Sequence, residues 1–363
     1  MRVHVVDPSA YTPPYDHALC SALAQAGADV ELYTSRFAYG ELPPPVGYQR
    51  REFFYRGARL VARARERRLI KLAEHVPDML RYRRAAAGAD VVHLQWLTVQ
   101  HLDGRLLPAR SRAGARRPLV LTAHDVLPRE PRLGQGRAQR RLYERFDAVV
   151  VHSEHGRERL ARELGVKEAR VHVIPHGALR HLTDGPVAPI PFQTHKPVVL
   201  FFGLLREYKG LDVLLRAWRG IQEAELWVVG MARMNTSSLR AAAPANVRFD
   251  QRFISEDELR AYFRRADLVA LPYREIEQSG VLFTALAFGK PLLLSDVGGF
   301  GEVAATGAAR TVGAGDACAL HAALIELLGD PAALALMSQR ARAAAAGEFA
   351  WEGIAARTLA LYE

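Results

Sequence analysis

The stretch at residues 271–303 constrains the fold of this chain most, because it contains a complete strand–helix–strand unit. An apolar run ends just before Pro272, and a polar loop follows it. The helix-like run at 279–288 can end at Gly289 in the left-handed conformation, and a second apolar strand at 292–295 leads into a glycine-rich loop. Such a unit predicts a parallel sheet whose ligand-facing loops follow the carboxyl ends of the strands.

The start of this helix has the features of a binding site. Ser279 is placed to cap the N-terminus, where the first backbone N–H groups have no partner within the helix. Gly280 lets a ligand approach the backbone closely, and Thr284 lies one turn later on the same face. We therefore expect an anion that carries hydroxyl groups to bind here.

Strands and helices alternate in both halves of the 363-residue chain. This length suits two domains, and the stretch at 182–197, which has four prolines and no periodicity, separates them. We assign residues 1–183 to the first domain and 197–350 to the second, and the helix at about 351–363 can pack back on the first. The alternation predicts an α/β protein of two doubly wound parallel sheets, with a ligand between them at the carboxyl ends of the strands.

The individual strands are expected to be short. They lie at 3–7, 30–34, 91–97, 119–122, 148–151 and 171–174 in the first half, and at 198–202, 226–229, 247–249, 268–271 and 292–295 in the second. A basic helix is expected at 59–72, and Ser255 with Glu258 predicts a capping box. The first strand-to-helix turn carries no G-x-G-x-x-G, so we do not expect dinucleotide binding there.

Composition restricts the setting of the protein. The only cysteines, Cys20 and Cys318, are far apart in sequence, which is neither a disulfide framework nor a metal cluster and fits a reducing cytoplasm. No apolar run approaches the ~18 residues that a membrane span needs, and the N-terminus is typical of a first strand rather than of a signal peptide. We therefore expect a cytoplasmic location.

The net charge of +10 is unevenly distributed. Between residues 50 and 84 there are twelve basic residues and only four acidic ones. A surface this basic attracts phosphates or anionic lipid headgroups, so we expect a peripheral contact with an anionic membrane face or a phosphate-bearing acceptor. A solvated arginine-rich face is the alternative. Nucleic-acid binding is not expected, because the stretch has neither interleaved aromatics nor a known module.

The first strand of the second half ends in a loop with two fixed positive charges, Arg206 and Lys209. The fork of Arg206 can hold phosphate oxygens, and Lys209 adds a point charge. We expect both to be exposed loop charges that lie beside the helix start at Ser279. Together with that helix they would form a diphosphate pocket.

Three ordered segments, FFGLLREYKGLDVLLRAW, RFISEDELRAYFRRADLVALPY and QSGVLFTALAFGKPLLLSDVGG, resemble the family 4 glycosyltransferases of the GT-B fold. The resemblance covers essentially the whole chain and is strongest at 198–303. It implies two Rossmann-like domains that face a central cleft, with a nucleotide-diphosphate sugar held mainly by the second. It also implies hexosyl transfer with retention at the anomeric carbon. Neither a cofactor nor a metal would be required, and the donor would be a UDP- or GDP-type co-substrate.

The resemblance also implies roles for individual residues. Arg206 and Lys209 would hold the donor diphosphate and its developing charge, and His124 would lie near the reacting carbon. The remaining candidates on the donor side are Phe253 and Ile254 at the base, and Gln278, Ser279, Gly280 and Val281 at the sugar and phosphates. The loop with Tyr15, Asp16 and His17 resembles the acceptor-side loop of the family in position only.

The chain departs from the family in one place. The family usually has two glutamates separated by seven residues, and here the second position is Thr284 while the first falls on Ile276. Glu277, one residue later, could still reach the sugar hydroxyls, although a solvated loop carboxylate is the alternative. A nucleotide-sugar epimerase, a sugar phosphorylase and a silent sugar-nucleotide-binding protein of the same fold therefore stay open. The acceptor is not identified by the sequence.

Overall fold

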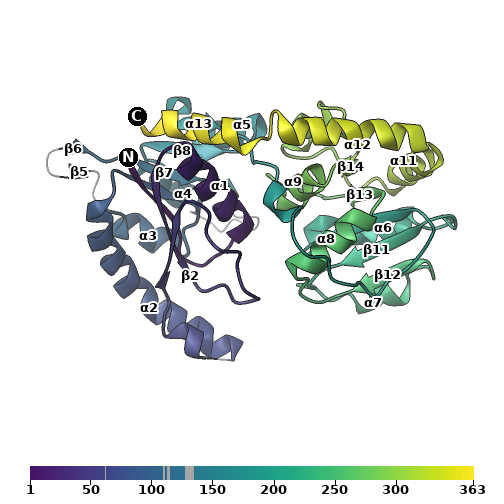
Figure 1. Cartoon of the computed structure of the whole chain (residues 1–363), viewed down its shortest axis with the longest axis horizontal. Coiled ribbons are helices and arrows are strands. Elements are labelled where there is room, and N and C mark those ends of the chain that lie inside the picture. The colour runs from purple at the N-terminus through teal and green to yellow at the C-terminus, as the bar shows by residue number, and fades with distance from the viewer. Residues whose placement is uncertain (62, 109–110, 113–114, 127–134) are drawn as a thin grey trace. The chain divides into compact units, whose positions relative to one another are not determined.

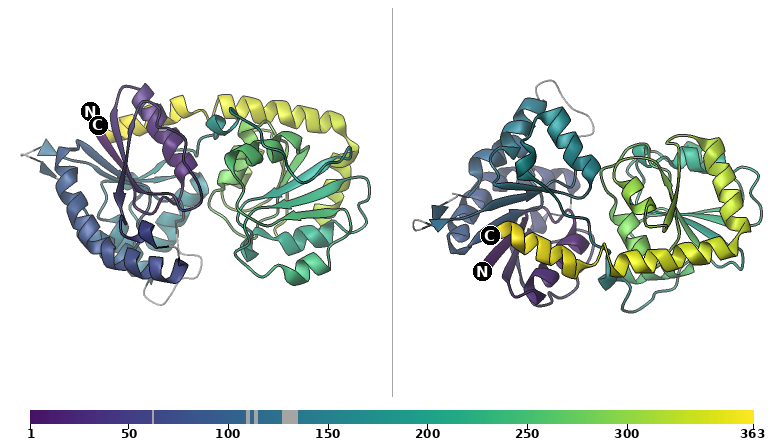
Figure 2. Two further views of the ribbon diagram at one scale, coloured as in Figure 1. Left: turned by 60° about the horizontal axis from the view of Figure 1, so that its bottom comes forward. Right: turned by 90° about the horizontal axis from the view of Figure 1, so that it is seen from above.

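The computed structural model describes residues 1–363 except 62, 109–110, 113–114 and 127–134. It divides into two compact units (Figure 1). Unit 1 comprises Met1–Pro175 and Trp351–Glu363, and unit 2 comprises His176–Ala350. Each unit contains a parallel sheet with helices on both of its faces (Figures 1 and 2).

Unit 1 is built on a seven-stranded sheet in which all paired strands are parallel. In spatial order the strands are β3 (Gln49–Phe54), β2 (Asp29–Ser35), β1 (Arg2–Asp7), β4 (Val91–Leu94), β7 (Leu119–Thr122), β8 (Ala148–Val151) and β9 (Val171–Val173). The helices are α1 (Pro13–Gln25), α2 (Ala64–Ala85), α3 (Gln100–Leu106), α4 (Gln135–Tyr143), α5 (Glu154–Leu164) and α13 (Trp351–Tyr362). A two-stranded hairpin, β5 (Ser111–Arg112) and β6 (Ala115–Arg116), lies apart from the sheet. Chain order reverses direction between β1 and β4.

The C-terminal helix α13 belongs to unit 1 and packs on α1 (Figure 1). The Tyr362 hydroxyl lies 2.6 Å from Nδ1 of His93 on β4, and Trp351 meets Tyr15 of α1 edge-on with ring centroids 5.2 Å apart. These contacts use buried side chains at both ends of the helix, so α13 is part of the core of unit 1.

Unit 2 has a six-stranded sheet, again with parallel pairing throughout. In spatial order the strands are β12 (Val247–Asp250), β11 (Glu225–Val229), β10 (Val198–Phe202), β13 (Leu268–Leu271), β14 (Leu292–Ser295) and β15 (Ala309–Val312). The helices are α6 (Leu211–Ala217), α7 (Ser237–Ala241), α8 (Glu256–Arg265), α9 (Gly280–Ala287), α10 (Phe300–Ala304), α11 (Ala317–Gly329) and α12 (Pro331–Ala346). Chain order reverses between β10 and β13, and β10, β11, β13 and β14 are fully buried, as expected of a sheet covered on both faces.

The predicted α/β fold with two doubly wound sheets is confirmed, with local differences. The edge strands β3 and β15 were not predicted, because Gln49–Phe54 and Ala309–Val312 are only partly buried and lack a continuous apolar run. The basic helix runs over Ala64–Ala85 rather than 59–72, and Pro77 lies inside it. The capping box of Ser255 and Glu258 is present, and Gly289 follows α9 with φ 62°.

The boundary between the units lies at Pro175 rather than in the proline-rich stretch at 182–197. Residues after Pro175 are bonded into unit 2: the Ala178 N–H donates to Phe349 O, and the Arg260 guanidinium donates to Leu182 O. Proline content indicated an irregular segment, but irregular backbone can still be fixed by hydrogen bonds to its own domain.

Among the described residues, no single helix is long and apolar enough to cross a membrane. One bent pair, Ala317–Gly329 with Pro331–Tyr362, passes the same test by length and composition.

Candidate active site

The candidate donor site lies in unit 2, where the chain order of the sheet reverses. Doubly wound sheets bind ligands in the crevice beyond the carboxyl ends of the two strands at this point, which here are β10 and β13. The loop after β10 carries Arg206 and Lys209, and the loop after β13 leads into α9. The topology therefore places the two predicted motifs beside each other.

The predicted contact between the β10 loop and the start of α9 is present. A Cβ atom built on Gly203 would lie 2.9 Å from Lys209 Nζ and 3.1 Å from Val281 Cγ2. Gly203 adopts φ 106°, which L-residues rarely adopt, so this close approach depends on glycine. Lys209 and the first turn of α9 are thus brought to one point.

The two cations differ in their surroundings. Arg206 is exposed, as predicted, at the start of the short 3-10 turn Glu207–Lys209. Lys209 is only 6% exposed, and its Nζ lies 5.1 Å from the ring centroid of Tyr273, the second residue after β13. The expectation that Lys209 is an exposed loop charge is therefore wrong: the side chain is packed under the loop and its ammonium rests on an aromatic face.

A second set of contacts fixes the β10 loop to the β13 loop. The Arg274 N–H donates to Tyr208 O at 2.7 Å, and the Arg274 guanidinium donates to Glu207 O and to the Asp212 carboxylate. Gly210 adopts φ 69°, and a Cβ there would lie 2.0 Å from Pro272 O. The strand-end loops are therefore held together by backbone and side-chain contacts, and at Gly210 their approach leaves no room for a side chain.

The start of α9 differs from the predicted cap. Ser279 is the N-cap residue, but its side chain makes no capping hydrogen bond. Its backbone carbonyl accepts from Leu282 and Phe283, while Gly280 is exposed and nothing lies within 4 Å of a Cβ built on it. This is the accessible helix start that the sequence predicted for an anion.

Thr284 and Glu277 occupy the place where the family usually has its two glutamates. The Thr284 hydroxyl donates to Gly280 O at 2.8 Å within α9, and the residue is buried. Glu277 is also buried, which excludes the alternative of a solvated loop carboxylate. Its carbonyl accepts from Gly299, so the β13 and β14 loops meet here. Of the two residues, Glu277 keeps a carboxylate at this end of the sheet.

The predicted base-binding residues follow β12. Phe253 is 39% exposed, whereas Ile254 is half-buried and packs on the core of unit 2. Two residues earlier, Gln251 accepts from Thr236 Oγ1, and its own Nε2 is buried with no hydrogen-bond partner among the described residues. Gln251 was not predicted, because a glutamine after a strand gives no signal of its own.

In unit 1, His124 follows β7 inside an aromatic enclosure. Its ring stacks on Trp96 with centroids 5.0 Å apart and an interplanar angle of 12°, and Tyr15 meets it edge-on at 4.8 Å. Trp96 is held in turn by a hydrogen bond from Nε1 to Thr12 Oγ1. The imidazole is half-buried, so its ring plane is fixed while part of it remains accessible.

His152 determines which nitrogen of His124 carries a proton. His152 Nδ1 lies 3.0 Å from Ile174 O and must donate to it. Burial lowers the pKa of His152 to about 4, so the ring is neutral and its Nε2 is an acceptor. His124 Nδ1, 3.2 Å away, therefore donates to His152. His124 Nε2 lies 3.1 Å from the Oε1 of Gln95, which only accepts, so this contact is a hydrogen bond only when Nε2 carries a proton.

The predicted acceptor-side residues Tyr15, Asp16 and His17 lie among the first five residues of α1, and all three are buried. Burial and the neighbouring Asp7 raise the pKa of Asp16 well above its usual value. The Asp7 carboxylate accepts backbone N–H groups of the loop before α1, so Asp16 is the member of the pair that keeps a proton. His17 contacts the Tyr48 hydroxyl at 3.0 Å.

Several residues of the unit 1 site were not predicted from sequence. Gln95, Trp96 and His152 follow strands β4 and β8, so their position at the carboxyl edge of the sheet was available in principle. Nothing in the sequence indicated that His152 would face His124, because the pairing depends on the order of strands in the sheet.

Two Rossmann-like units, one of which brings Lys209 to the start of a helix at the point where its sheet reverses chain order, are typical of GT-B glycosyltransferases. The family described as "Glycosyltransferase Family 4" matches residues 15–178, and that described as "Glycosyl transferases group 1" matches 196–330. A GDP-mannose-dependent alpha-(1-6)-phosphatidylinositol monomannoside mannosyltransferase of Mycolicibacterium smegmatis is 30% identical over 271 residues, which cover 69% of this chain and 71% of that protein. The chain belongs to the family 4 glycosyltransferases.

Two further proteins are similar to this chain. A GDP-mannose:glycolipid 4-beta-D-mannosyltransferase of Xanthomonas campestris pv. campestris is 27% identical over 223 residues, or 56% of this chain, and the match spans 60% of that relative's length. Among solved structures, a sucrose-phosphate synthase from Thermosynechococcus elongatus superposes with a TM-score of 0.76 at 21% identity, covering 100% of this chain and 98% of that one. The latter match concerns the fold alone.

Proposed function

We propose that this protein transfers a hexosyl group from a nucleotide-diphosphate sugar to an acceptor, with retention at the anomeric carbon. The observation that carries the proposal is the convergence of Gly203, Lys209 and Val281 where the β10 loop meets α9. A diphosphate there would face two cations and the N–H groups of a helix start, an arrangement that favours negative charge. The names of both sequence relatives contain GDP-mannose, which makes it the first donor to test.

In the proposed reaction, the bond between the anomeric carbon and the leaving phosphate oxygen breaks first and leaves an oxocarbenium-like centre. Arg206, Lys209 and the N–H groups of residues 279–281 stabilise the negative charge that develops on the diphosphate. The acceptor hydroxyl attacks from the same face and gives its proton to the leaving phosphate. The products are the hexosylated acceptor and a nucleoside diphosphate, and no enzymic nucleophile is needed.

His124 is proposed to act near the reacting carbon. Its Nδ1 proton is committed to His152, so Nε2 is the atom that would contact substrate. In the neutral ring Nε2 accepts a hydrogen bond, and in the protonated ring it donates one. Trp96 and Tyr15 hold the ring plane for either role.

The activity test is transfer of mannose from GDP-mannose to acceptors in a lipid extract, followed by NMR of the new anomeric centre. We expect the configuration of the donor to be kept, and an inverted product would reject the retaining mechanism. Transfer should also survive excess EDTA, because the cation pair supplies the charge that a metal would bring. Among the described residues no group of three or more histidines, cysteines or acids could hold a metal ion.

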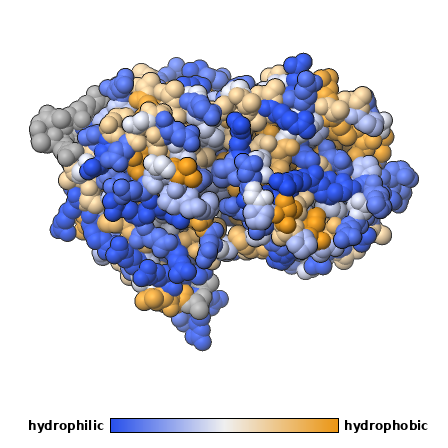
Figure 3. All heavy atoms as spheres, in the orientation of Figure 1, coloured by the Kyte–Doolittle hydropathy of each residue, from blue (hydrophilic) through white to orange (hydrophobic). Residues whose placement is uncertain are grey.

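We further propose that α2 gives the protein a peripheral contact with anionic membranes. Leu69 and Leu72 of α2 are 69% and 61% exposed, Leu60 in the turn before α2 is 81% exposed, and exposed arginines lie among them. Figure 3 shows hydrophobic and hydrophilic surface side by side at the N-terminal end of α2. Apolar side chains beside cations suit the interface of an anionic bilayer. Both relatives carry lipids in their names, which supports this contact.

Pelleting with vesicles tests the contact. The protein should sediment with phosphatidylglycerol vesicles but not with phosphatidylcholine, and salt should release it. A Leu69→Gln/Leu72→Gln variant should bind less, whereas Leu336→Gln, at an exposed leucine of unit 2, should bind as the wild type does. Equal binding to both lipids, or no effect of the α2 variant, would leave a solvated basic face as the better account.

A further inference from the structure

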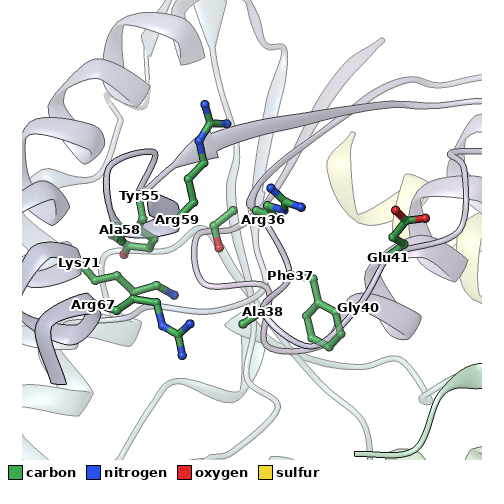
Figure 4. A pocket seen from close by; sticks show the side chains of 11 residues that line it. Arg36, Phe37, Ala38, Gly40, Glu41, Tyr55, Ala58, Arg59, Arg67 and Lys71 are labelled. Carbon is green, nitrogen blue, oxygen red and sulfur yellow. The ribbon is translucent and has the colours of Figure 1, made fainter. Parts of the chain in front are cut away.

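A pocket of about 450 Å³ lies in unit 1, between the segment after β2 and the first turns of α2 (Figure 4). Arg36, Arg59, Arg67 and Lys71 line it, together with Ser35 and Tyr55. Arg67 and Lys71 are one helical turn apart on α2, and their side chains extend toward Phe37 and Ala38 (Figure 4). The volume of the pocket is in the range that holds small-molecule ligands.

The four cations of this pocket have no ion-pair partner in the part of the chain that the structure describes. Among the described residues, none of them has a carboxylate within 4.0 Å, although Glu41 also lines the pocket. Some neighbouring arginines outside the pocket do have such partners: Arg51 pairs with Glu31, and Arg81 with Asp78. The cations that face the pocket therefore retain their charge, as do the exposed Arg65 and Arg68 of α2, which do not line it.

Lys71 is held in a partly dehydrated position. Its Nζ lies 5.1 Å from the ring centroid of Tyr55. Burial, with a smaller effect from the charge of Arg67, lowers the pKa of Lys71. Holding a cation here costs free energy that a bound anion would offset.

Ser35 adds an observation that is independent of charge. The residue ends β2 and is 3% exposed, yet its Oγ has no hydrogen-bond partner among the described residues. A buried hydroxyl without a partner destabilises the folded state, so such groups usually meet a ligand or water. Ser35 is one of the residues that line the same pocket as the four cations.

We propose that this pocket binds a phosphate group carried by the acceptor. The cations match its charge, the Ser35 hydroxyl can donate to one of its oxygens, and the remaining volume accommodates the attached sugar or polyol. The pocket lies at the carboxyl end of β2, the same edge of the sheet as Asp7 of β1 and the residues after β7. The assignment of this phosphate to the acceptor rests on the proposed glycosyl transfer, whereas binding of the phosphate itself does not.

Calorimetric titration of the full chain with glucose 6-phosphate, with glucose as the neutral control, tests the pocket. Wild type should bind the phosphate saturably. Lys71→Met and Arg67→Gln should each weaken binding about tenfold or more, because each removes a charge-assisted hydrogen bond. Ser35→Ala should weaken it about two- to fivefold. Arg105→Gln, an equal change of charge at an exposed site on α3, should have no effect.

A second arm distinguishes the source of the phosphate. If only phosphatidylglycerol vesicles bind, and Lys71→Met or Arg67→Gln removes that binding, the pocket receives a lipid phosphate. Melting curves establish whether the variants are folded. If Lys71→Met does not fold, Arg67→Gln, at a half-buried side chain, provides the test. Binding by neither probe, or equal binding by wild type and both variants, would overturn the proposal. Phosphate binding without any hexosyl transfer would reject the proposed function and leave the pocket assignment intact.

Discussion

The reversal points of the two sheets occupy the same topological position, but their side chains differ in kind. In unit 2 the strand-end loops meet at glycines and present Arg206, Lys209 and the start of α9. In unit 1 the corresponding edge is filled by the buried pair Asp7 and Asp16 and by rings around His124. The sheet determines where a ligand binds, and the side chains determine whether the site handles fixed charge or protons.

The largest effects on kcat are expected from replacing the cations of unit 2, Arg206 and Lys209. Arg206→Ala and Lys209→Ala should each lower kcat by about 10²-fold or more, and raise the donor KM less, because the charge on the diphosphate grows toward the transition state. Arg206→Lys should rescue only in part, since a point charge does not replace a bidentate fork. Steady-state kinetics with GDP-mannose gives both constants.

The melting temperatures of the same two variants distinguish a role in charge stabilisation from a role in packing. Exposed Arg206 should be removable with little change in Tm, whereas removal of buried Lys209 should lower Tm as well, because its contact with Tyr273 is lost. Near wild-type kcat in both alanine variants would place the reaction elsewhere.

In unit 1 the strongest effect should come from the hydrogen bond that orients His124. His152→Phe removes the acceptor for His124 Nδ1 while filling the space, and we expect kcat to fall about tenfold with the donor KM unchanged. His195→Phe, at an exposed position, is the control. A rise in donor KM with constant kcat would mean that His152 shapes donor binding rather than the orientation of His124.

Glu277 and Thr284 test which residue replaces the usual glutamate pair. Glu277→Gln should raise the donor KM about tenfold, on the scale of one hydrogen bond to a charged group. Thr284→Val should change it less than about threefold, because the Thr284 hydroxyl is already bonded to Gly280 O. The reverse order of effects would mean that Thr284 turns toward the sugar when the donor binds.

The smallest effect on catalysis should come from Asp16→Asn, whose consequence is a change in the pH dependence of stability. Because the pKa of Asp16 is raised in the folded state, its protonated carboxyl stabilises the folded wild type at low pH. The free energy of unfolding should then decrease as pH rises from about 4 toward the folded-state pKa of Asp16. The loss should approach about 1.4 kcal/mol per pH unit, and the variant should lack this part of the dependence. Urea unfolding at several pH values measures it, and parallel curves would show that Asp16 is ionised in the folded protein.

The sequence predicted unit 2 better than unit 1 for a physical reason. The donor-side motifs are contiguous: the loop with Arg206 and Lys209 follows one strand, and Ser279, Gly280 and Thr284 follow another. The enclosure of His124 combines residues from four separate segments, which only the order of strands brings together. The main error was the predicted exposure of Lys209: its charge favoured an exposed position, but the side chain is buried. The sequence indicated the basic pocket only as the charged stretch at 50–84. Ser35 and Arg36, which also line the pocket, precede that stretch, so their part in the pocket was not predicted.

The central claim is that the junction of the β10 loop and α9 holds the second phosphate of the donor nucleotide. Calorimetric titration with GDP and GMP, and with UDP and UMP in parallel, tests it without requiring an acceptor. Wild type should prefer the diphosphate of its nucleoside by about tenfold or more, and this preference should fall toward unity in Arg206→Ala and Lys209→Ala. An undiminished preference in both variants would contradict the account.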